Sequence, residues 1–416
     1  MSVINILGIN ISALNKVDIL KKIELFLKDG RQHQIVTPNP EFLIEAEKDE
    51  EFFYILNAAD LAVPDGIGLK FAARLMGKRL DRIAGADLVY DICAIAERKG
   101  KSIYLIGGEK GIAQKAAENL KKKFPDLKIV GAEEGLKHGE WKIKAGEWIK
   151  GEDKDEELIK RIDSARPDII FSAFGHPRQD KWIFHDLRKT PSVKIGMGVG
   201  GTFDFIAGKV KRAPKIFRFF GMEWAWRLIL EPWRWKRILD ATVIFPYRFI
   251  MWRFVYPLFY RPNVACVLYK KENGKFKILL VKRAGYEEHW QVPQGGTDHE
   301  NIEKAGLREL REELCTTKFK PVRAIKNVYK YKFRDKKEMG KYESRAMRIL
   351  GYKGQKQGLF IAEFAGTDSD IKINYWDHSG WKWIDSEKLV EEVHPVRRHS
   401  AKIFLEKFRE SVEKNG

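Results

Sequence analysis

Short apolar runs alternate with amphipathic stretches over the first two hundred residues of the chain. Lys101–Ile106 (KSIYLI) has the continuous apolar character of a buried strand, and a helical periodicity follows over Ile112–Phe124. Leu127–Val130 predicts the next strand, which makes a βαβ unit with a right-handed connection. Asp168–Ala173 and Val193–Met197 repeat the pattern of a strand that runs into a glycine-rich loop. The region therefore predicts an α/β sheet with ligands at the carboxyl ends of its strands.

The pattern changes at three places further along the chain. His138–Glu157 is rich in Lys, Glu, Gly and Trp, and predicts a solvated insertion. From Lys209 onward basic residues mix with Trp, and after Arg261 strand-like runs return at Val264–Tyr269 and Lys277–Lys282. These changes predict three domains, over residues 1–208, 209–259 and 260–416.

Composition narrows the class of protein and its partners. A chain of 416 residues is too long for one typical domain. Its formal net charge of +19 favours an anionic partner, which could be nucleic acid, phospholipid headgroups or a phosphorylated substrate. The 3 cysteines have no CxxC spacing, which argues against a disulfide framework or a zinc site and favours the cytoplasm.

No membrane-crossing or secretory segment is expected. The first residues, MSVINILGINISALNK, lack the basic start, long apolar run and cleavage site of a signal peptide. The longest apolar stretch, Val243–Tyr260, is interrupted by Arg248 and Arg253, whereas a spanning helix needs about 20 mostly apolar residues.

Four polar segments follow apolar runs, where an α/β sheet carries its ligands. They are Thr37–Pro40 (TPNP), Pro64–Gly68 (PDGIG), Gly175–Asp180 (GHPRQD) and Gly198–Asp204 (GVGGTFD). Asp65 is the candidate base, since such a carboxylate can deprotonate an acceptor hydroxyl that attacks an anomeric carbon. The alternative is a turn residue that caps the helix beginning near Ile67. The glycine pairs, Gly107-Gly108 among them, could equally be tight turns.

Together these segments resemble the WecG/TagA/CpsF family of bacterial glycosyltransferases. TPNPE, PDGIG, GADL, YLIGG, GHPRQDKW and GVGGTFDFIAGKVKRAP occur in that family's order over roughly residues 1–240. The resemblance implies a Rossmann-like domain that transfers N-acetylmannosamine, or its uronic acid, from UDP with inversion and without a metal. The acceptor it implies is undecaprenyl-diphosphate-N-acetylglucosamine, which receives a β-1,4 linkage in cell-surface polymer synthesis.

The resemblance also implies roles for individual residues. Asp65 becomes the base, Thr37 and Asn39 become polar groups of the substrate site, and Gln179 with the Gly107-Gly108 turn becomes part of the donor site. Asp180 stands where the family often has Glu.

The basic, tryptophan-rich segment 209–259 has helical spacing between Trp224, Arg227, Glu231 and Arg234. Trp favours the boundary between water and hydrocarbon, and each Lys or Arg contributes about 1 kcal/mol at an anionic surface. The segment therefore suits a helical appendage on the inner face of the cell membrane, although a packed helical subdomain or a nucleic-acid interface would also explain it. The family resemblance favours the membrane and implies that arginines close over the donor diphosphate, namely Arg227, Arg218 and Arg212.

The string Arg308–Glu313 (RELREE) carries the chemistry of the last domain. On a helix Glu309, Glu312 and Glu313 stand at i, i+3 and i+4 and share one face. Hard oxygen ligands of this kind suit Mg²⁺, while the alternative is a solvated acidic face.

The string resembles the Nudix box, and its flanks resemble the RNA pyrophosphohydrolase and dinucleoside-tetraphosphate hydrolase branch. These flanks are YRPNVACVL, WQVPQGG and GQKQGLF, and the likeness covers nearly all of residues 260–416. It implies an α/β/α sandwich in which Mg²⁺ assists the attack of water on a nucleoside di- or polyphosphate or an RNA 5′ end. Glu309, Glu312 and Glu313 would hold the metal, with Glu312 and Glu313 catalytic; the phosphate and site-lining residues would be Arg261, Lys282, Gln294, Gln355 and Gln357.

This segment departs from the Nudix pattern twice. The spacing from Gly295 to Glu300 is one residue shorter than usual, and Cys315 replaces a glycine. The chain is thus interpreted as a fusion of two enzymes. Its expected partners are a UDP-sugar, a polyprenyl-linked acceptor, an anionic membrane surface and a nucleotide, and the sequence is compatible with a homo-oligomer. Two alternatives are a Nudix domain that only senses nucleotide and an RNA-binding protein with a vestigial first domain.

Overall fold

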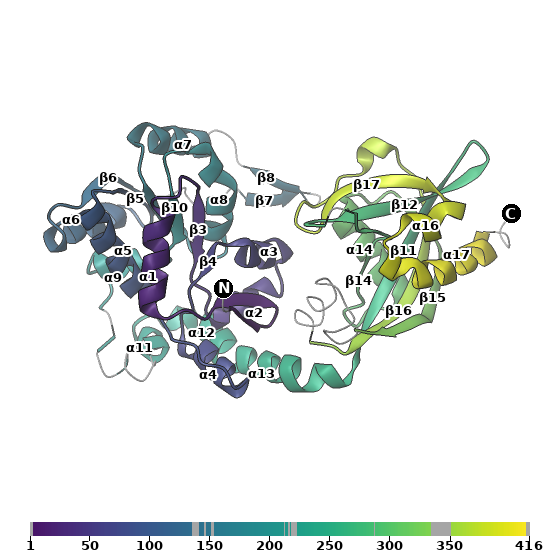
Figure 1. Cartoon of the computed structure of the whole chain (residues 1–416), viewed down its shortest axis with the longest axis horizontal. Coiled ribbons are helices and arrows are strands. Elements are labelled where there is room, and N and C mark those ends of the chain that lie inside the picture. Colours follow the sequence, from purple (N-terminus) through teal and green to yellow (C-terminus); the bar gives the residue numbers. More distant parts are fainter. Residues whose placement is uncertain are drawn as a thin grey trace. The chain divides into compact units, whose positions relative to one another are not determined.

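The computed structural model describes residues 3–134, 141–144, 147–150, 154–211, 213–214, 217, 223–286, 288–333 and 351–412. The chain forms two compact units, shown in Figure 1. The first unit combines Met1–Glu140 with Gly151–Met251, and the second combines Trp141–Lys150 with Trp252–Gly416. Within the described residues, no helix has the length and apolar character that crossing a bilayer requires.

A six-stranded parallel sheet forms the centre of the first unit. Its strands, in spatial order, are β4 (Leu61–Ala62), β3 (His33–Val36), β10 (Ile195–Gly198), β9 (Ile169–Ala173), β5 (Ser102–Gly107) and β6 (Lys128–Glu133). A separate antiparallel hairpin pairs β1 (Val3–Ile6) with β2 (Ile9–Ser12). The parallel sheet confirms the α/β fold that the alternation of apolar runs and helical stretches predicted.

Helices cover both faces of this sheet, and side chains alternate between two hydrophobic cores. On β5, Ile103 and Leu105 enter one core, whereas Tyr104 and Ile106 enter the other. The first core is completed by α1 (Lys16–Phe26), α5 (Gly85–Lys99), α6 (Ile112–Lys123) and α9 (Thr202–Ile206), and the second by α7 (Lys154–Ala165) and α8 (Arg178–Asp186). Burial on both faces explains why the strand segments are almost continuously apolar.

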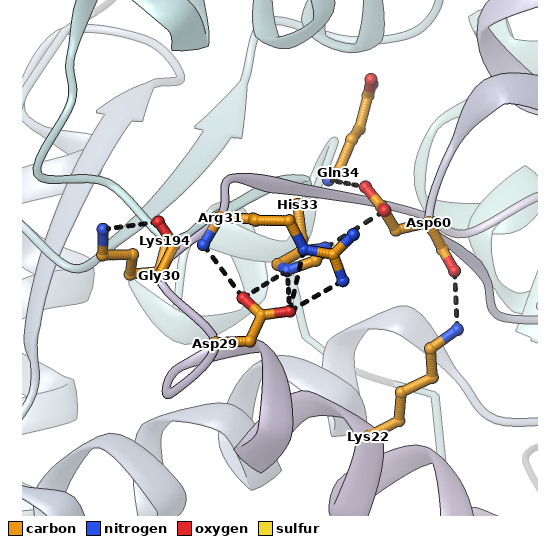
Figure 2. A network of polar contacts seen from close by, with 8 residues as sticks. All are labelled: Lys22, Asp29, Gly30, Arg31, His33, Gln34, Asp60 and Lys194. Atoms are coloured by element: carbon orange, nitrogen blue, oxygen red, sulfur yellow. Dashed lines mark hydrogen bonds and ion pairs between the residues drawn. The ribbon is translucent and has the colours of Figure 1, made fainter.

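A buried histidine fixes the amino end of β3 (Figure 2). The His33 ring lies 2.9 Å from an oxygen of Asp29 and 3.1 Å from one of Asp60, and it stacks on Phe26 at 3.8 Å. The hydrogen bond from His33 holds the pKa of Asp29 well below its usual range. Asp60 also accepts from the backbone N–H of Gln34 at 3.0 Å. This network anchors the strand at the end opposite to Thr37.

The predicted insertion contains regular structure. Strands β7 (Trp141–Lys144) and β8 (Glu147–Lys150) form an antiparallel hairpin, and α7 already begins at Lys154. The expectation of a solvated insertion over His138–Glu157 therefore missed two strands and a helix start; the other residues of that stretch lie outside the described ones.

The basic segment that closes the first unit is largely helical. It comprises α11 (Glu223–Leu230), a 3-10 turn (Pro232–Arg234), α12 (Trp235–Leu239), a π-helical turn (Asp240–Ile244) and α13 (Phe245–Ile250). Phe245 and Phe249 are buried, and α13 packs against α2 (Pro40–Ala46) and α4 (Ile67–Leu75). Two of the arginines expected over the site, Arg212 and Arg218, lie outside the described residues, and the side chain of Arg227 is not described.

The second unit is a mixed sheet between two helical layers, as predicted for a Nudix sandwich. Its main strands are β11 (Tyr260–Glu272), β12 (Lys275–Arg283), β13 (Trp290–Gln291), β14 (Gln294–Gly296), β15 (Phe319–Lys332), β16 (Gly354–Phe364) and β17 (His378–Asp385). On β11, Ala265 and Val267 pack toward α17 (Arg398–Val412) and α16 (Leu389–Glu392), while Val264 and Cys266 pack toward α14 (Ile302–Leu314).

Candidate functional sites

A pocket of about 680 Å³ lies at the carboxyl ends of the parallel strands in the first unit. The loops after β3, β4, β5, β9 and β10 all contribute to its wall, as expected for an open α/β sheet. The pocket brings together residues that lie far apart in the sequence, and those predicted for the transferase site that line it are Thr37, Asn39, Asp65, Gly107, Gly108 and Gln179.

The carboxylate of Asp65 contacts the start of a helix that is distant in sequence. Helix α4 begins at Ile67, and its N-cap residue is Gly66. One carboxylate oxygen of Asp65 accepts from the backbone N–H of Gly85 at 3.2 Å, at the first residue of α5. The other lies 3.8 Å from Nε of Arg82. Both the helix N-terminus and the guanidinium attract the negative charge of a carboxylate.

Thr37 and Asn39 enter the pocket from the β3 loop. Asn39 caps α2, since its side-chain oxygen accepts from the N–H of Phe42 at 2.9 Å. Thr37 is 9% exposed, and a Cβ added to Gly85 would lie 3.6 Å from its hydroxyl and 3.5 Å from the Asp65 carboxylate. The hydroxyl and the carboxylate therefore converge on one small stretch of backbone.

Gln179 braces the glycine loop after β10. Its side chain is 2% exposed, and its amide oxygen accepts from the N–H of Gly200 at 2.9 Å. A side chain at Gly198 would come within 2.5 Å of the Gln179 amide nitrogen, so the loop needs glycine there. In this structure Gln179 positions one wall of the pocket.

The Gly107-Gly108 turn is also required by close packing. Gly107 has φ of +109°, and a Cβ there would lie 2.8 Å from the backbone carbon of Ala173. The N–H of Gly108 donates to the Ala173 carbonyl at 3.2 Å. Because Gly107 and Gly108 have no side chains, their backbone lines the pocket where the loop to α6 begins.

The appendage supplies basic and aromatic groups that were not singled out from the sequence as site residues. Arg234, Arg237 and Trp226 line the pocket. Arg237 forms a hydrogen-bonded ion pair with Glu41 and lies 3.3 Å from Nδ1 of His176. Although burial raises it, the pKa of Glu41 is lowered on balance by hydrogen bonds from His176 and Arg237. Arg234 and Arg237 stand at i, i+3 and follow Arg227 by seven and ten residues, a helical signal that could have pointed to them.

In the second unit, the three glutamates of the predicted metal site lie on α14, and Arg308 bonds two of them. Its guanidinium donates to Glu309 at 2.9 Å and to Glu312 at 3.0 Å, and also to the carbonyl of Gly296 at 2.7 Å. The carboxylates are of the type that Mg²⁺ prefers. In the structure as described, however, no three acidic, His or Cys side chains converge closely enough to hold a metal ion.

Glu309 and Glu313 face β14, the short strand that precedes α14. A Cβ on Gly295 would lie 1.7 Å from the Glu309 carboxylate, so this glycine is needed to make room for it. Glu313 accepts from the N–H of Gln294 at 3.2 Å. The three glutamates thus suit a hard cation, because they are carboxylates and lie on one face of α14. Metal binding would require Arg308 to release Glu309 or Glu312.

Two of the predicted polar residues of this unit, Gln294 and Gln357, are hydrogen-bonded to each other. Gln357 donates to Asn263 at 2.8 Å and to Gln294 at 3.0 Å, and Gln355 accepts from Tyr331 at 2.5 Å. Arg261 packs against Gly296, whose Cβ would lie 2.4 Å from its guanidinium. Lys282 lies 5.8 Å from the centre of the Trp290 ring.

Both departures from the Nudix pattern have local structural consequences. In the shortened loop, Asp298 and His299 have φ of +44° and +69°. Cys315, which ends α14, has φ of +50° in the left-handed region that favours glycine. The chain follows the turn that glycine would adopt, at a cost in backbone strain.

A parallel sheet covered by helices on both faces, with a polar pocket at its strand ends, gives the first unit the architecture of an α/β protein whose ligand site lies at the strand ends. Residues 4–257 match the glycosyl transferase WecG/TagA/CpsF family, and the chain belongs to this family. It is 35% identical over 238 residues to an N-acetylglucosaminyldiphosphoundecaprenol N-acetyl-beta-D-mannosaminyltransferase of Bacillus subtilis (strain 168), covering 57% of this chain and 86% of that protein. The protein of the same name from Staphylococcus aureus (strain MRSA252) is 30% identical over 250 residues, covering 59% and 91%.

Residues 259–406 match the NUDIX domain. A solved structure of a C. elegans Ap4A hydrolase is 22% identical, with a TM-score of 0.26, over 35% of this chain and 94% of that one. A likeness this distant indicates no substrate. The chain is thus an enzyme that joins a glycosyltransferase-family unit to a Nudix hydrolase domain.

Proposed function

We propose that the first unit transfers N-acetylmannosamine, or its uronic acid, from UDP to undecaprenyl-diphosphate-N-acetylglucosamine, with inversion and without a metal. The observation that carries this proposal is that Asp65, Thr37 and Gln179 line the same pocket as Arg234 and Arg237 of the appendage. Two relatives that the chain covers almost completely bear the name of this reaction.

Asp65 acts as the base in this proposal. It would accept the proton of the acceptor hydroxyl as that oxygen attacks the anomeric carbon and the bond to UDP breaks. Its bond to Gly85 and its proximity to Arg82 support the role, because they orient the carboxylate. Thr37 and Asn39, on the same wall, would hold sugar hydroxyls.

The donor diphosphate would lie between the Gly107-Gly108 turn and the appendage. Arg234 and Arg237 supply guanidinium groups that bind phosphate oxygens in a bidentate manner. Arg227, Arg218 and Arg212 remain proposed partners in the same closure. Stabilising the departing UDP by these cations would make a metal unnecessary for the transfer.

We place the working boundaries at residues 208 and 259, with the segment between them as the part that contacts the membrane. Its tryptophans support this placement, since Trp233 and Trp235 are 71% and 54% exposed while neighbouring arginines line the pocket. The protein would then act in the cytoplasm, peripheral to the inner face of the cell membrane, in cell-surface polymer synthesis.

We propose that the Nudix domain is an active pyrophosphohydrolase for a nucleoside di- or polyphosphate. Glu309, Glu312 and Glu313 would hold Mg²⁺, which when bound supplies an activated water and offsets phosphate charge. Arg261, Lys282, Gln294, Gln355 and Gln357 would contact the substrate. An RNA 5′ end is a further substrate class, and a nucleotide sensor without hydrolysis is the competing function.

The first experiment measures UDP release from UDP-N-acetylmannosamine in EDTA, with and without a short-chain lipid-diphosphate-N-acetylglucosamine. Acceptor-dependent release by the wild type that disappears in Asp65→Asn is the expected result. Equal release without acceptor, or none from the wild type, would contradict the proposed transfer.

The hydrolase is tested on the full chain with nucleoside polyphosphates and Mg²⁺. Hydrolysis should require the metal and be lost in Glu312→Gln. Nucleotide binding without any product would favour the sensor.

A further inference from the structure

Helix α4 presents a mixed apolar and basic face to solvent, and this face is not part of the pocket. Phe71 and Leu75, one turn apart, are 58% and 62% exposed. Lys70 and Arg74 are exposed beside them. The segment Gly66–Leu80 contains four basic residues and no Asp or Glu. The helix itself thus presents two large apolar side chains beside two exposed basic residues, while Arg79, beyond its end, pairs with Asp81.

The orientation of α4 is fixed by its inner face. Leu69, Ala72 and Ala73 are buried, and a Cβ on Gly68 would lie 3.4 Å from the Phe245 ring of α13. Since α13 and the body of the unit hold these residues, α4 cannot rotate to bury Phe71 and Leu75. Their exposure is a consequence of the fold.

The same surface continues into the appendage. On α13, Tyr247 is 57% and Ile250 is 49% exposed, and Val243 just before it is 54% exposed. Figure 1 shows α4, α12 and α13 along one edge of the first unit, and α13 packs on α4. The helices that carry these exposed apolar side chains, α4 and α13, therefore lie against each other.

We propose that α4 is a second membrane-binding element, which inserts Phe71 and Leu75 into the interface of an anionic bilayer beside α12 and α13. This inference rests on the proposed function, because it explains how a lipid-linked acceptor reaches the base. Helix α4 begins two residues after Asp65, and at about 1.5 Å per residue Phe71 and Leu75 lie about 6 and 12 Å along its axis. The bilayer would then contact the enzyme within about two helical turns of the site where the acceptor hydroxyl is deprotonated.

Charge selects a bilayer over a second copy of this chain as the occupant. Two copies meeting through this face would bring the basic residues of both α4 helices together, and like charges repel. Anionic headgroups attract Lys and Arg, and the interface accommodates Phe and Leu below them.

The test is co-sedimentation of the full chain with vesicles of phosphatidylglycerol and phosphatidylcholine. The variant Phe71→Ser/Leu75→Ser should bind at least about tenfold more weakly than wild type. The matched control is Val17→Ser/Leu25→Ser on α1, where the two side chains are 61% and 62% exposed. The control should bind as wild type does.

A second variant tests the charge separately. Lys70→Gln/Arg74→Gln should weaken binding to vesicles rich in phosphatidylglycerol and leave binding to pure phosphatidylcholine unchanged. Unaltered vesicle binding in both α4 variants would overturn the proposal. It would also be overturned if Phe71→Ser/Leu75→Ser dissociated an oligomer in sedimentation velocity while retaining its vesicle binding.

Activity on a water-soluble acceptor separates this inference from the proposed function. The α4 variants should retain wild-type rates with a short-chain acceptor and lose rate only with acceptor embedded in vesicles. If the wild type binds vesicles through α4 but transfers no sugar, the proposed transfer is refuted. The inference that α4 binds membranes would still hold.

Discussion

At the scale of single residues, Asp65 and Asp180 are two carboxyl groups with opposite surroundings. Asp65 lies in the pocket, where a backbone N–H and Arg82 contact its carboxylate. Asp180 is the next residue after Gln179, is 1% exposed, and burial raises its pKa to about 7. Position in the fold, rather than residue type, separates a candidate base from a buried acid.

Asp65→Asn should lower acceptor-dependent UDP release by at least about 100-fold, because an amide cannot accept the proton. The fold should persist, since the amide oxygen can still accept from Gly85. Initial rates in EDTA provide the measurement, with Asp81→Asn, a partly exposed aspartate that pairs with Arg79, as the control. A rate within about twofold of wild type would exclude Asp65 as the base.

Asp180→Asn should stabilise the first unit increasingly as the pH rises. An unfolded aspartate titrates near 3.9, and the folded group titrates near 7, so the folded state binds the proton more tightly. The wild type therefore loses stability as the pH rises between these values, whereas the amide does not titrate.

Thermal unfolding at pH 5 and pH 8 measures this effect. The melting temperature of Asp180→Asn should exceed that of wild type by more at pH 8 than at pH 5. Asp163→Asn, an exposed aspartate on α7, is the control. A difference that does not change with pH would show that Asp180 is not buried as a neutral acid.

At the scale of elements, the appendage holds α2 through two arginine–glutamate pairs that differ in position. Arg237 pairs with Glu41 and lines the pocket, while Arg248 bonds Glu47 at 2.7 Å and is not among the lining residues. The two pairs offer a matched comparison between donor binding and simple packing of the appendage.

Arg237→Ala should raise KM for the UDP-sugar by about tenfold or more, because a charge-assisted bond to phosphate is lost. Arg248→Ala should change KM by less than about twofold. Steady-state kinetics with both variants decides the matter. Equal effects would indicate that both arginines only attach the appendage.

Helix α14 ends in a residue whose type does not suit its conformation. Cys315→Gly should stabilise the second unit by about 0.5 kcal/mol, the net of relieved left-handed strain and the greater flexibility of glycine when unfolded. Cys315→Ala keeps the Cβ and should not stabilise. Urea unfolding of both variants measures the difference, and greater stability in the alanine variant would rule out backbone strain as the cause.

At the scale of the whole molecule, the two units should work by separable chemistry. Excess EDTA should abolish nucleotide hydrolysis and leave sugar transfer within about twofold of its original rate, because only the second site is proposed to use a metal. Asp65→Asn should do the reverse. Parallel assays of one preparation test this, and loss of both activities in EDTA would show that transfer also needs a metal.

The strands of the first sheet and the polar segments that follow them can be predicted from the sequence alone. Runs such as Lys101–Ile106 are apolar because both faces of the sheet are covered, so the signal is local. The sequence also supplies the glycines at Gly107 and Gly198, where close packing excludes a side chain. The family motifs indicate Asp65 as the candidate base without any knowledge of the fold.

Which side chains contact each other depends on how distant elements pack. Asp65 binds the start of α5, twenty residues away, and Arg237 pairs with Glu41 across nearly two hundred residues. Arg308 bonds two of the three glutamates, and α4 leaves Phe71 and Leu75 on an outer surface. Periodicity reports one element at a time, whereas these relations arise when separate elements pack and bring distant side chains within bonding distance.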